Sequence, residues 1–181
     1  MKILVGSMYC FENEYEDSIL SLYQQTYRKF DHFKVEKLPN KLAHDTLYST
    51  FMENSKFYDL FLKLDADMVI CKNSFLQDIV NFLKNKKILT NLQIKVHDFF
   101  TDRLIWGLHI FNNKNKWVKN NELVFTDMVS LHNERINISS LDSPLVPAAW
   151  HSPNPSLIQA FHFGIHKAVK ATQFRNSIKQ S

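Results

Sequence analysis

Hydrophobic and polar positions along the chain predict that strands and helices alternate through its first half. Short apolar runs bounded by turn residues indicate buried strands, whereas apolar residues that recur every three to four positions indicate helices with one buried face. The predicted elements, in order, are a strand at 2–5 that ends in a turn at Gly6 and Ser7, a helix at 14–30, a strand at 33–38, a helix at 40–54, a strand at 57–64, and a helix that begins at Asn73 or Ser74.

This alternation predicts an α/β fold with a mostly parallel, Rossmann-like sheet flanked by helices. The second half of the chain has a looser pattern, with neither an internal repeat nor a linker, so we expect a single domain. Its predicted elements are strands at 87–92, 104–111 and 136–141, a loop or hairpin tip at 112–121, and helices at 122–134 and 156–171.

Composition agrees with one folded domain. The chain has 181 residues, of which 45% are hydrophobic and 22% charged, and this excludes disordered and fibrous proteins. It contains no apolar run long enough to cross a bilayer. The N-terminal residues lack the pattern of a cleavable signal, and Cys10 and Cys71 are far apart in sequence, so we expect a cytoplasmic protein with two buried free thiols.

The net charge is +4, and basic residues gather near the C-terminus at Lys167, Lys170, Arg175 and Lys179. Such a cluster is typical of a solvated helix end, and it is also compatible with peripheral contact at the inner face of a membrane. We expect no nucleic-acid partner. An oligomer is an open alternative, because the chain is small for an enzyme that binds both a donor and an acceptor.

The most informative segment is FLKLDADMVI, which places two carboxylates at the end of an apolar strand. Side chains two apart on a strand point to the same face, so Asp65 and Asp67 are expected to converge on one site. Open α/β sheets bind ligands at this end of their strands. Because Mg²⁺ and Mn²⁺ bind carboxylate and phosphate oxygens together, the two aspartates predict a binding site for a metal-bound diphosphate. The plain alternative is an exposed turn, where Asp-x-Asp also occurs.

The segments SILSLYQQTYRKF and KLDADM, in this order, resemble the first helix and the Asp-x-Asp motif of family 2 glycosyltransferases of the GT-A fold. The resemblance implies transfer of a sugar from a nucleoside diphosphate sugar, a UDP-sugar by preference, to a saccharide or lipid-linked acceptor. It also implies that Mn²⁺ or Mg²⁺ is bound mainly by Asp67, with Asp65 on the donor ribose or on the metal through water. Residues 1–92 would then bind the nucleotide sugar and residues 93–181 the acceptor.

The same resemblance implies roles for three residues of the second half. Asp127, at the head of the predicted helix 122–134, matches the base that takes the acceptor proton in an inverting reaction; the plain alternative is a carboxylate that interacts with the helix dipole, and Glu122 is a neighbouring candidate. In FHFGIHK, His162 matches a third metal ligand and Lys167 a contact to the diphosphate. We expect His151 and His166 to be hydrogen-bonded structural residues.

The sequence departs from the family after the second strand, where Glu36 is the only acidic residue in FKVEKLPN and no base-reading aspartate pair occurs. Trp106 is a candidate platform for an acceptor sugar, but an aromatic-rich strand is also typical of a core, and His97, Asp98 and Asp102 resemble solvated loop residues. Two alternatives to a glycosyltransferase stay open. One is a nucleotidyltransferase or phosphohydrolase that uses the same carboxylates; the other is a non-catalytic saccharide-binding domain.

Overall fold

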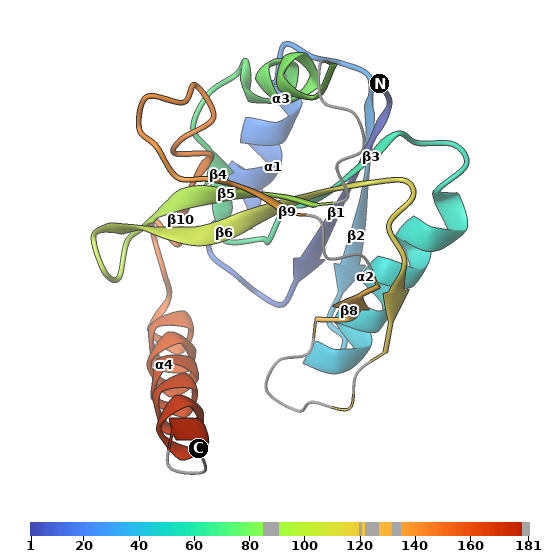
Figure 1. The fold of residues 1–181 in the computed structure, drawn as a ribbon. Helices are drawn as coiled ribbons and strands as arrows, with labels where there is room; N and C mark the ends of the chain where they lie inside the picture. Colours follow the sequence, from blue (N-terminus) through green and yellow to red (C-terminus); the bar gives the residue numbers. More distant parts are fainter. Residues whose placement is uncertain (85–90, 120, 122–126, 132–134, 179–181) are drawn as a thin grey trace.

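The computed structural model describes residues 1–84, 91–119, 121, 127–131 and 135–178 (Figure 1). Its elements, in chain order, are β1 (Ile3–Tyr9), α1 (Tyr15–Tyr23), β2 (Phe30–Glu36), α2 (Asn40–Asn54), β3 (Leu60–Lys63), β4 (Met68–Ile70), α3 (Phe75–Lys84), β5 (Asn91–Asp98), β6 (Arg103–Asn112), β7 (Trp117–Val118), β8 (Val129–Ser130), β9 (Arg135–Ile138), β10 (Ala149–His151) and α4 (Leu157–Ile178).

One mixed sheet organises the described residues, and its strand order is β2-β1-β3-β6-β5-β10-β4, with β9 paired to β5. Parallel pairing joins β1 to β2 and β3, and β5 to β9 and β10; β6 runs antiparallel to both β3 and β5, and β4 runs antiparallel to β10. The predicted α/β class is therefore confirmed. Strands from residues 1–92 lie at both ends of this order, so the two predicted halves share one sheet.

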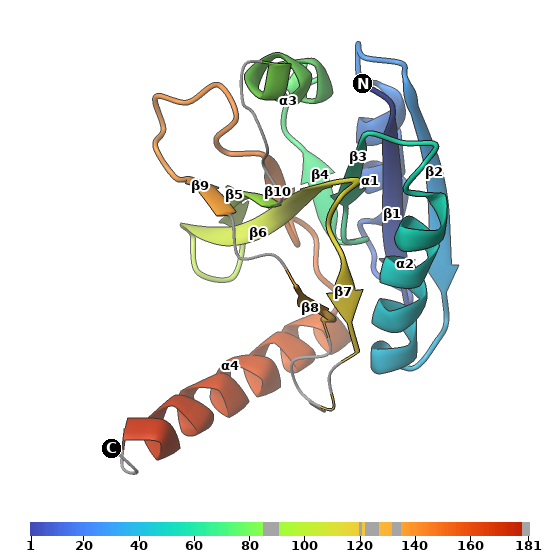
Figure 2. The same ribbon diagram turned by 45° about the vertical axis from the view of Figure 1, so that its right-hand side comes forward.

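Two apolar cores lie on the two faces of the sheet. Alternate side chains of each strand point to opposite faces, so Leu60 and Leu62 pack with α1 and α3, whereas Phe61 packs with α2. On the α2 face, Phe61 stacks on Phe51 with ring centroids 4.2 Å apart, and Trp117 packs edge-on against Phe51 at 5.2 Å. Figure 2 shows α2 on one side of β1 and β3, with α1 on the other.

Several sequence predictions are confirmed, with changes at element ends. The helix at 40–54 has the predicted bounds. The turn at Gly6 and Ser7 is wrong, because both residues continue β1, where Gly6 is paired on both sides by β2 and β3. The helix at 14–30 ends at Tyr23, and beyond it the buried Gln25 side chain turns toward α3 and accepts a hydrogen bond from Leu76 N.

The second half differs more. The predicted helix at 122–134 is wrong in its described part, where Val129–Ser130 forms β8 and pairs with β7 inside the expected loop. The short β4 was not predicted. Of the strand expected at 87–92, residues 87–90 lie outside the described residues, and β5 runs from Asn91. No helix in the described ranges is long and apolar enough to cross a membrane.

The last helix, α4, leaves the body of the molecule as an arm (Figures 1 and 2). Its first turn is closed by a reciprocal cap, in which Gln159 N donates to Ser156 Oγ at 3.1 Å and Ser156 N donates to Gln159 Oε1 at 2.9 Å. Gln159 Nε2 also donates to Glu14 Oε2 at 2.7 Å, which ties this turn to the start of α1.

Candidate functional site

The two aspartates of the Asp-x-Asp segment lie in the tight turn that joins β3 to β4, not on a strand. Strand β3 ends at Lys63, and Asp65 O accepts the turn hydrogen bond from Met68 N at 2.9 Å. The argument from strand alternation is therefore wrong. The expectation that Asp65 and Asp67 share a site nevertheless agrees with the structure, because both line one cavity.

Asp67 is held by a residue in a rare backbone conformation. Ser152 has a φ of 50°, is 2% exposed, and donates its Oγ–H to Asp67 Oδ2 at 2.8 Å. Its backbone N–H also donates to Asp67 O at 2.7 Å. Non-glycine residues with positive φ persist where the surroundings fix them and are enriched at functional sites. Burial raises the pKa of Asp67, while the nearby His151 and the Ser152 hydroxyl act in the opposite direction.

His151 links Asp67 to a second, fully buried carboxylate. Its Nδ1 lies 2.7 Å from Asp98 Oδ1 and its Nε2 lies 3.3 Å from Asp67 Oδ2. The parallel pairing of β10 with β5 places His151 beside Asp98 in register. Asp98 also accepts hydrogen bonds from Thr101 N and Oγ1. The expectation that Asp98 is a solvated loop residue is wrong, and the structural role expected for His151 misses that it contacts the Asp-x-Asp segment.

Asp127 is surrounded by donors rather than placed at the head of a helix. Lys63 Nζ lies 3.0 Å from Asp127 Oδ1, Tyr48 Oη donates to it at 2.8 Å, and His44 Nδ1 lies 3.0 Å away. Burial would raise the pKa of Asp127, but the Lys63 charge and the contacts with His44 and Tyr48 outweigh it and hold the pKa well below its usual range. The structure therefore places Asp127 neither as a base at the head of a helix nor as a carboxylate that interacts with a helix dipole.

Lys63 balances the charge of this cluster. It is 8% exposed, and its Nζ lies 3.7 Å from Asp65 Oδ1 in addition to its contact with Asp127. Burial alone would lower the pKa of Lys63, but the two carboxylates raise it well above the usual value. Asp65 Oδ1 is buried and accepts no hydrogen bond from the described residues. This oxygen is therefore available to a further ligand.

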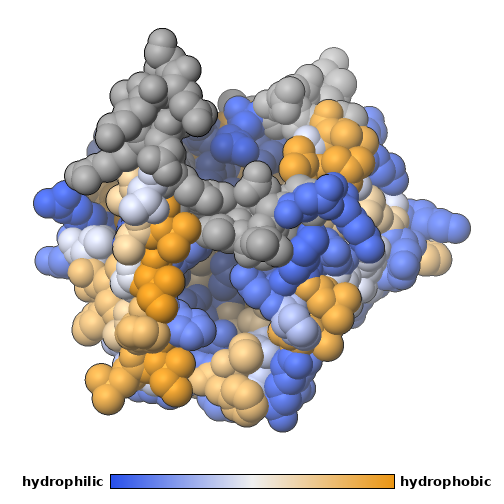
Figure 3. Space-filling model, turned by 90° about the horizontal axis from the view of Figure 1, so that it is seen from below, coloured by the Kyte–Doolittle hydropathy of each residue, from blue (hydrophilic) through white to orange (hydrophobic). Residues whose placement is uncertain are grey.

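The cavity has a volume of about 1050 Å³ and opens as a hollow in the face shown in Figure 3. The carboxyl ends of β1 and β3, the Asp-x-Asp turn, β6, β10 and the first half of α4 surround it. Five site residues predicted from the sequence contribute to its lining, namely Asp65, Asp67, Asp127, His162 and Lys167, whereas the alternative base Glu122 lies outside the described residues. His166 and Cys10 line it as well, and Cys10 is exposed, contrary to the expectation of two buried thiols.

A β-bulge aims an aromatic side chain into the cavity. Ile94 pairs with Leu108 and Lys95 pairs with Trp106, so Gly107 is the extra residue of β6. Bulges re-aim side chains and often lie beside functional sites. Trp106 is 42% exposed and lines the cavity, so the reading of this residue as core is wrong. Its role as a sugar platform stays a prediction.

The carboxylates of the cavity match one of the two common ways in which proteins hold a divalent cation. Among the described residues, no three histidine, cysteine, aspartate or glutamate side chains come together as a metal site. Mg²⁺ is commonly held by one or two carboxylates, with water and substrate phosphates as its other ligands. The Asp65–Asp67 pair fits that second arrangement, because its buried oxygen Asp65 Oδ1 accepts no hydrogen bond from the described residues.

Sequence reasoning missed the residues that support the carboxylates. His44 and Tyr48 come from α2, and Ser152 follows β10, so no local spacing connects them to Asp65 or Asp127. Lys63 was missed as well, although the sequence carries a signal for it: a lysine at the end of an apolar strand, next to two aspartates, is an unusual charge to bury. Glu36, the one acidic residue after β2, lies outside the cavity lining and pairs with Lys34 and Lys37.

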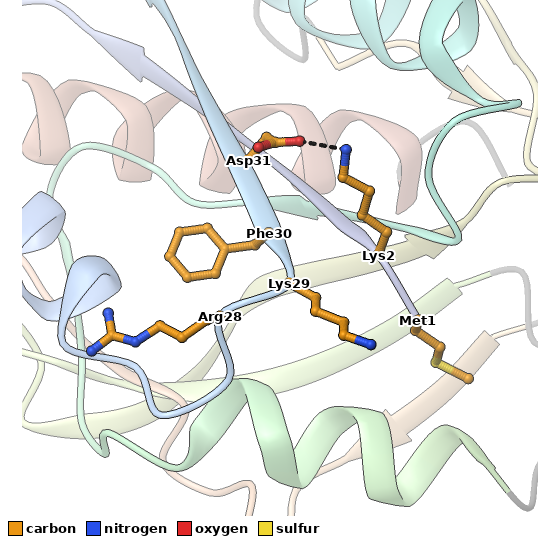
Figure 4. Close-up of a pocket in the computed structure, with 6 residues that line it drawn as sticks. All are labelled: Met1, Lys2, Arg28, Lys29, Phe30 and Asp31. Carbon is orange, nitrogen blue, oxygen red and sulfur yellow. Dashed lines mark ion pairs between the residues drawn. The ribbon is translucent and has the colours of Figure 1, made fainter.

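A second hollow, of about 400 Å³, lies at the other end of β1 and β2 (Figure 4). It is lined by basic residues and Phe30. Lys2 Nζ pairs with Asp31 Oδ2 at 2.7 Å, and both side chains are about half exposed. Arg28 donates to Tyr23 O. The charges of Lys2 and Asp31 are solvated and paired with each other, so this hollow does not have the features of a binding site.

A comparison with protein-family models finds no match to this chain, and a comparison with curated proteins finds none either. Among solved structures, the chain is similar to A197 from STIV, with a TM-score of 0.50 and 11% identity over 77% of this chain and 83% of A197. At this identity the likeness concerns the fold alone.

Two solved glycosyltransferase structures are less similar to this chain than A197 is, as their lower TM-scores show. One is involved in the glycosylation of the major capsid of PBCV-1 and has a TM-score of 0.45 and 12% identity, over 62% of this chain and 60% of that protein. The other is the apo form of GlyE from Streptococcus pneumoniae TIGR4, with a TM-score of 0.35 and 15% identity, over 62% of this chain and 34% of GlyE. The match thus spans less than two thirds of either glycosyltransferase.

Proposed function

We propose that this chain is a glycosyltransferase that moves a sugar from a nucleoside diphosphate donor, a UDP-sugar by preference, to a saccharide or glycoconjugate acceptor. The observation that carries the proposal is the convergence of Asp65, Asp67 and Asp127 on one cavity at the carboxyl ends of the strands. The cavity is also large enough for a nucleotide sugar. The sequence resemblance to family 2 glycosyltransferases supports the same function.

In this proposal Asp65 and Asp67 hold Mn²⁺ or Mg²⁺ together with the donor diphosphate. The ion, when bound, offsets the negative charge that develops on the diphosphate leaving group. Ser152 and the His151–Asp98 pair fix the Asp67 carboxylate. His151 is the histidine in contact with this carboxylate, and His162 lies in the cavity wall formed by α4.

Asp127 is the carboxylate that receives the acceptor hydroxyl. Its low pKa keeps it ionised at neutral pH, so it can accept a hydrogen bond and orient the attacking oxygen. A general base works best with a pKa near the working pH. Asp127 therefore has to lose its contact with Lys63 to become basic enough to take the proton, and we propose that acceptor binding separates the two side chains. Lys167 supplies positive charge at the diphosphate from the α4 wall.

One observation favours a second candidate function, a non-catalytic saccharide-binding domain. Lys63 already compensates Asp65 and Asp127, and the contacts with Lys63, His44 and Tyr48 reduce the basicity of Asp127. A cavity with this charge balance can bind a neutral sugar without a metal ion. The two candidates differ in whether binding requires a nucleotide and a divalent cation.

Thermal unfolding with a panel of nucleoside diphosphates, each with Mn²⁺ and with chelator, separates them. A ligand at a hundredfold excess over its dissociation constant stabilises the folded state by about 2.7 kcal/mol, which raises the Tm by a few degrees. We expect a Mn²⁺-dependent rise with one nucleotide, its loss in Asp67→Asn, and its retention in Asp142→Asn, which changes an exposed aspartate bonded to Ser140.

The transfer step is tested with the nucleotide sugar that corresponds to that nucleotide. We expect Asp127→Asn to keep the Tm rise but to lower release of the nucleoside diphosphate by at least about a hundredfold, the usual contribution of a positioned acid or base. A Tm rise with glycans alone, without metal and without nucleotide release, would instead assign the binding function. Turnover of a nucleoside triphosphate would assign a nucleotidyltransferase or phosphohydrolase.

A further inference from the structure

One face of α4 exposes large apolar side chains to solvent. Leu157 is 91% exposed, Ile158 71%, Phe161 67% and Ile165 48%. At 100° per residue these four positions fall within about a third of the helix circumference. We refer to them as the α4 stripe. Exposed apolar patches of this kind mark sites of interaction with proteins or membranes.

The α4 stripe points away from the rest of the protein. The opposite face carries Phe163, which stacks on Phe100 with ring centroids 4.2 Å apart, and Gln159, which bonds to Glu14. His162 and Lys167 turn toward the site cavity. In Figure 3 the hydrophobic residues of α4 form a band along the left side of the molecule, beside the hollow. No described part of the chain therefore covers the stripe.

The charge of α4 indicates which kind of surface the helix binds. Its 22 residues include Lys167, Lys170 and Arg175 but no aspartate or glutamate. A helix that combines exposed aromatic and aliphatic side chains with a net positive charge is typical of helices that lie in the interface of an anionic membrane. We infer that α4 binds an anionic lipid surface, with the stripe inserted at the level of the headgroups.

Two other partners, a second copy of the chain and a nucleic acid, explain fewer features of α4. Two copies paired through the α4 stripe would bring two basic helices together with no carboxylate on either helix to offset the repulsion. A nucleic acid would attract the lysines but would leave Phe161 and Ile165 in water. A lipid surface accounts for both the stripe and the positive charge of α4, because it provides hydrocarbon and negative charge side by side.

Vesicle flotation tests this inference with the full chain and without any nucleotide, so its outcome does not depend on the proposed enzymatic function. We expect the protein to float with phosphatidylcholine vesicles that contain phosphatidylglycerol, to float much less with phosphatidylcholine alone, and to be partly released by high salt. The double variant Phe161→Ser, Ile165→Ser should lower the partition coefficient at least about tenfold, since two inserted apolar side chains are lost.

Phe57→Ser is the matched control, because Phe57 is 64% exposed but lies between α2 and β3, outside the stripe. Its partition should equal that of the unchanged protein, and near-identical Tm values should show that all variants are folded. Equal partition of the stripe variant, or no flotation of the unchanged protein, would overturn the inference. So would a dimer in sedimentation that the stripe variant dissociates, since the stripe would then bind a second copy.

Discussion

At the scale of single residues, Lys63 controls the charge balance of the cavity. It is almost fully buried, and it contacts the carboxylates of Asp65 and Asp127. Lys63→Met keeps the apolar stem but leaves both carboxylates without their cation. Removing one partner of a buried ion pair typically costs several kcal/mol. Solvent reduces this loss here, because the Asp127 side chain is 56% exposed. We therefore expect Lys63→Met to lower the free energy of unfolding by about 2 kcal/mol at pH 7.

Urea unfolding at several pH values checks this prediction and its sign. The contacts with Lys63 lower the pKa of Asp127 in the folded protein, so their stabilising effect is present above the pKa of an unfolded aspartate, about 4. The difference between Lys63→Met and the unchanged protein should therefore be constant from pH 7 to pH 5 and should shrink at lower pH. Lys114→Met, at an exposed loop position, should change stability by less than about 0.5 kcal/mol. A deficit that grows on acidification would contradict this account.

At the scale of elements, the bulge at Gly107 fixes how closely β6 approaches its neighbours. A Cβ atom at this position would lie 2.5 Å from Val96 Cγ2 and 3.3 Å from Met68 Cε, and both side chains are buried. Because the valine is stiff, Gly107→Ala has to shift the strand, and we expect it to destabilise the protein by about 1–3 kcal/mol. It should also displace Trp106, which would be seen as a change in near-ultraviolet circular dichroism.

Gly164→Ala provides the comparison, because no atom lies within 4 Å of a Cβ built at Gly164 on the exposed α4. Alanine favours a helix over glycine by up to about 1 kcal/mol, so this variant should keep or raise the helix content and the Tm. If both variants lowered the Tm equally, a general intolerance of alanine, rather than the close contact with Val96, would explain the loss at Gly107.

The same elements show which parts of the structure could be predicted from the sequence. Strong local patterns, such as the period of α2 or the apolar run before Asp65, were sufficient for the α/β class and for the location of the site. The helix expected at 122–134 failed over its described residues, 127–131, because Val129 also suits a strand and pairing with β7 decides between the two. The supporting residues Ser152 and His44 reach Asp67 and Asp127 only through tertiary structure, so no spacing in the sequence indicates them.

At the scale of the whole molecule, the sheet order makes the two halves of the chain depend on each other. Strands β6, β5 and β10 of the second half lie between β3 and β4 of the first half. A unit made only of residues 1–92 would lose the partners of β3 and β4 on that side. We therefore predict that the described fold unfolds as one cooperative unit, although the resemblance to family 2 glycosyltransferases implied a donor half and an acceptor half.

The tryptophans allow a direct test of this cooperativity. Trp106, Trp117 and Trp150 all lie in the second half, whereas far-ultraviolet circular dichroism reports helices from both halves. Urea unfolding followed by tryptophan fluorescence and by circular dichroism should give the same midpoint and the same slope, as expected for a two-state transition. A fluorescence transition that precedes or follows the loss of helix would mean that residues 93–181 unfold separately. The shared sheet would then be a weaker link between the halves than its strand order indicates.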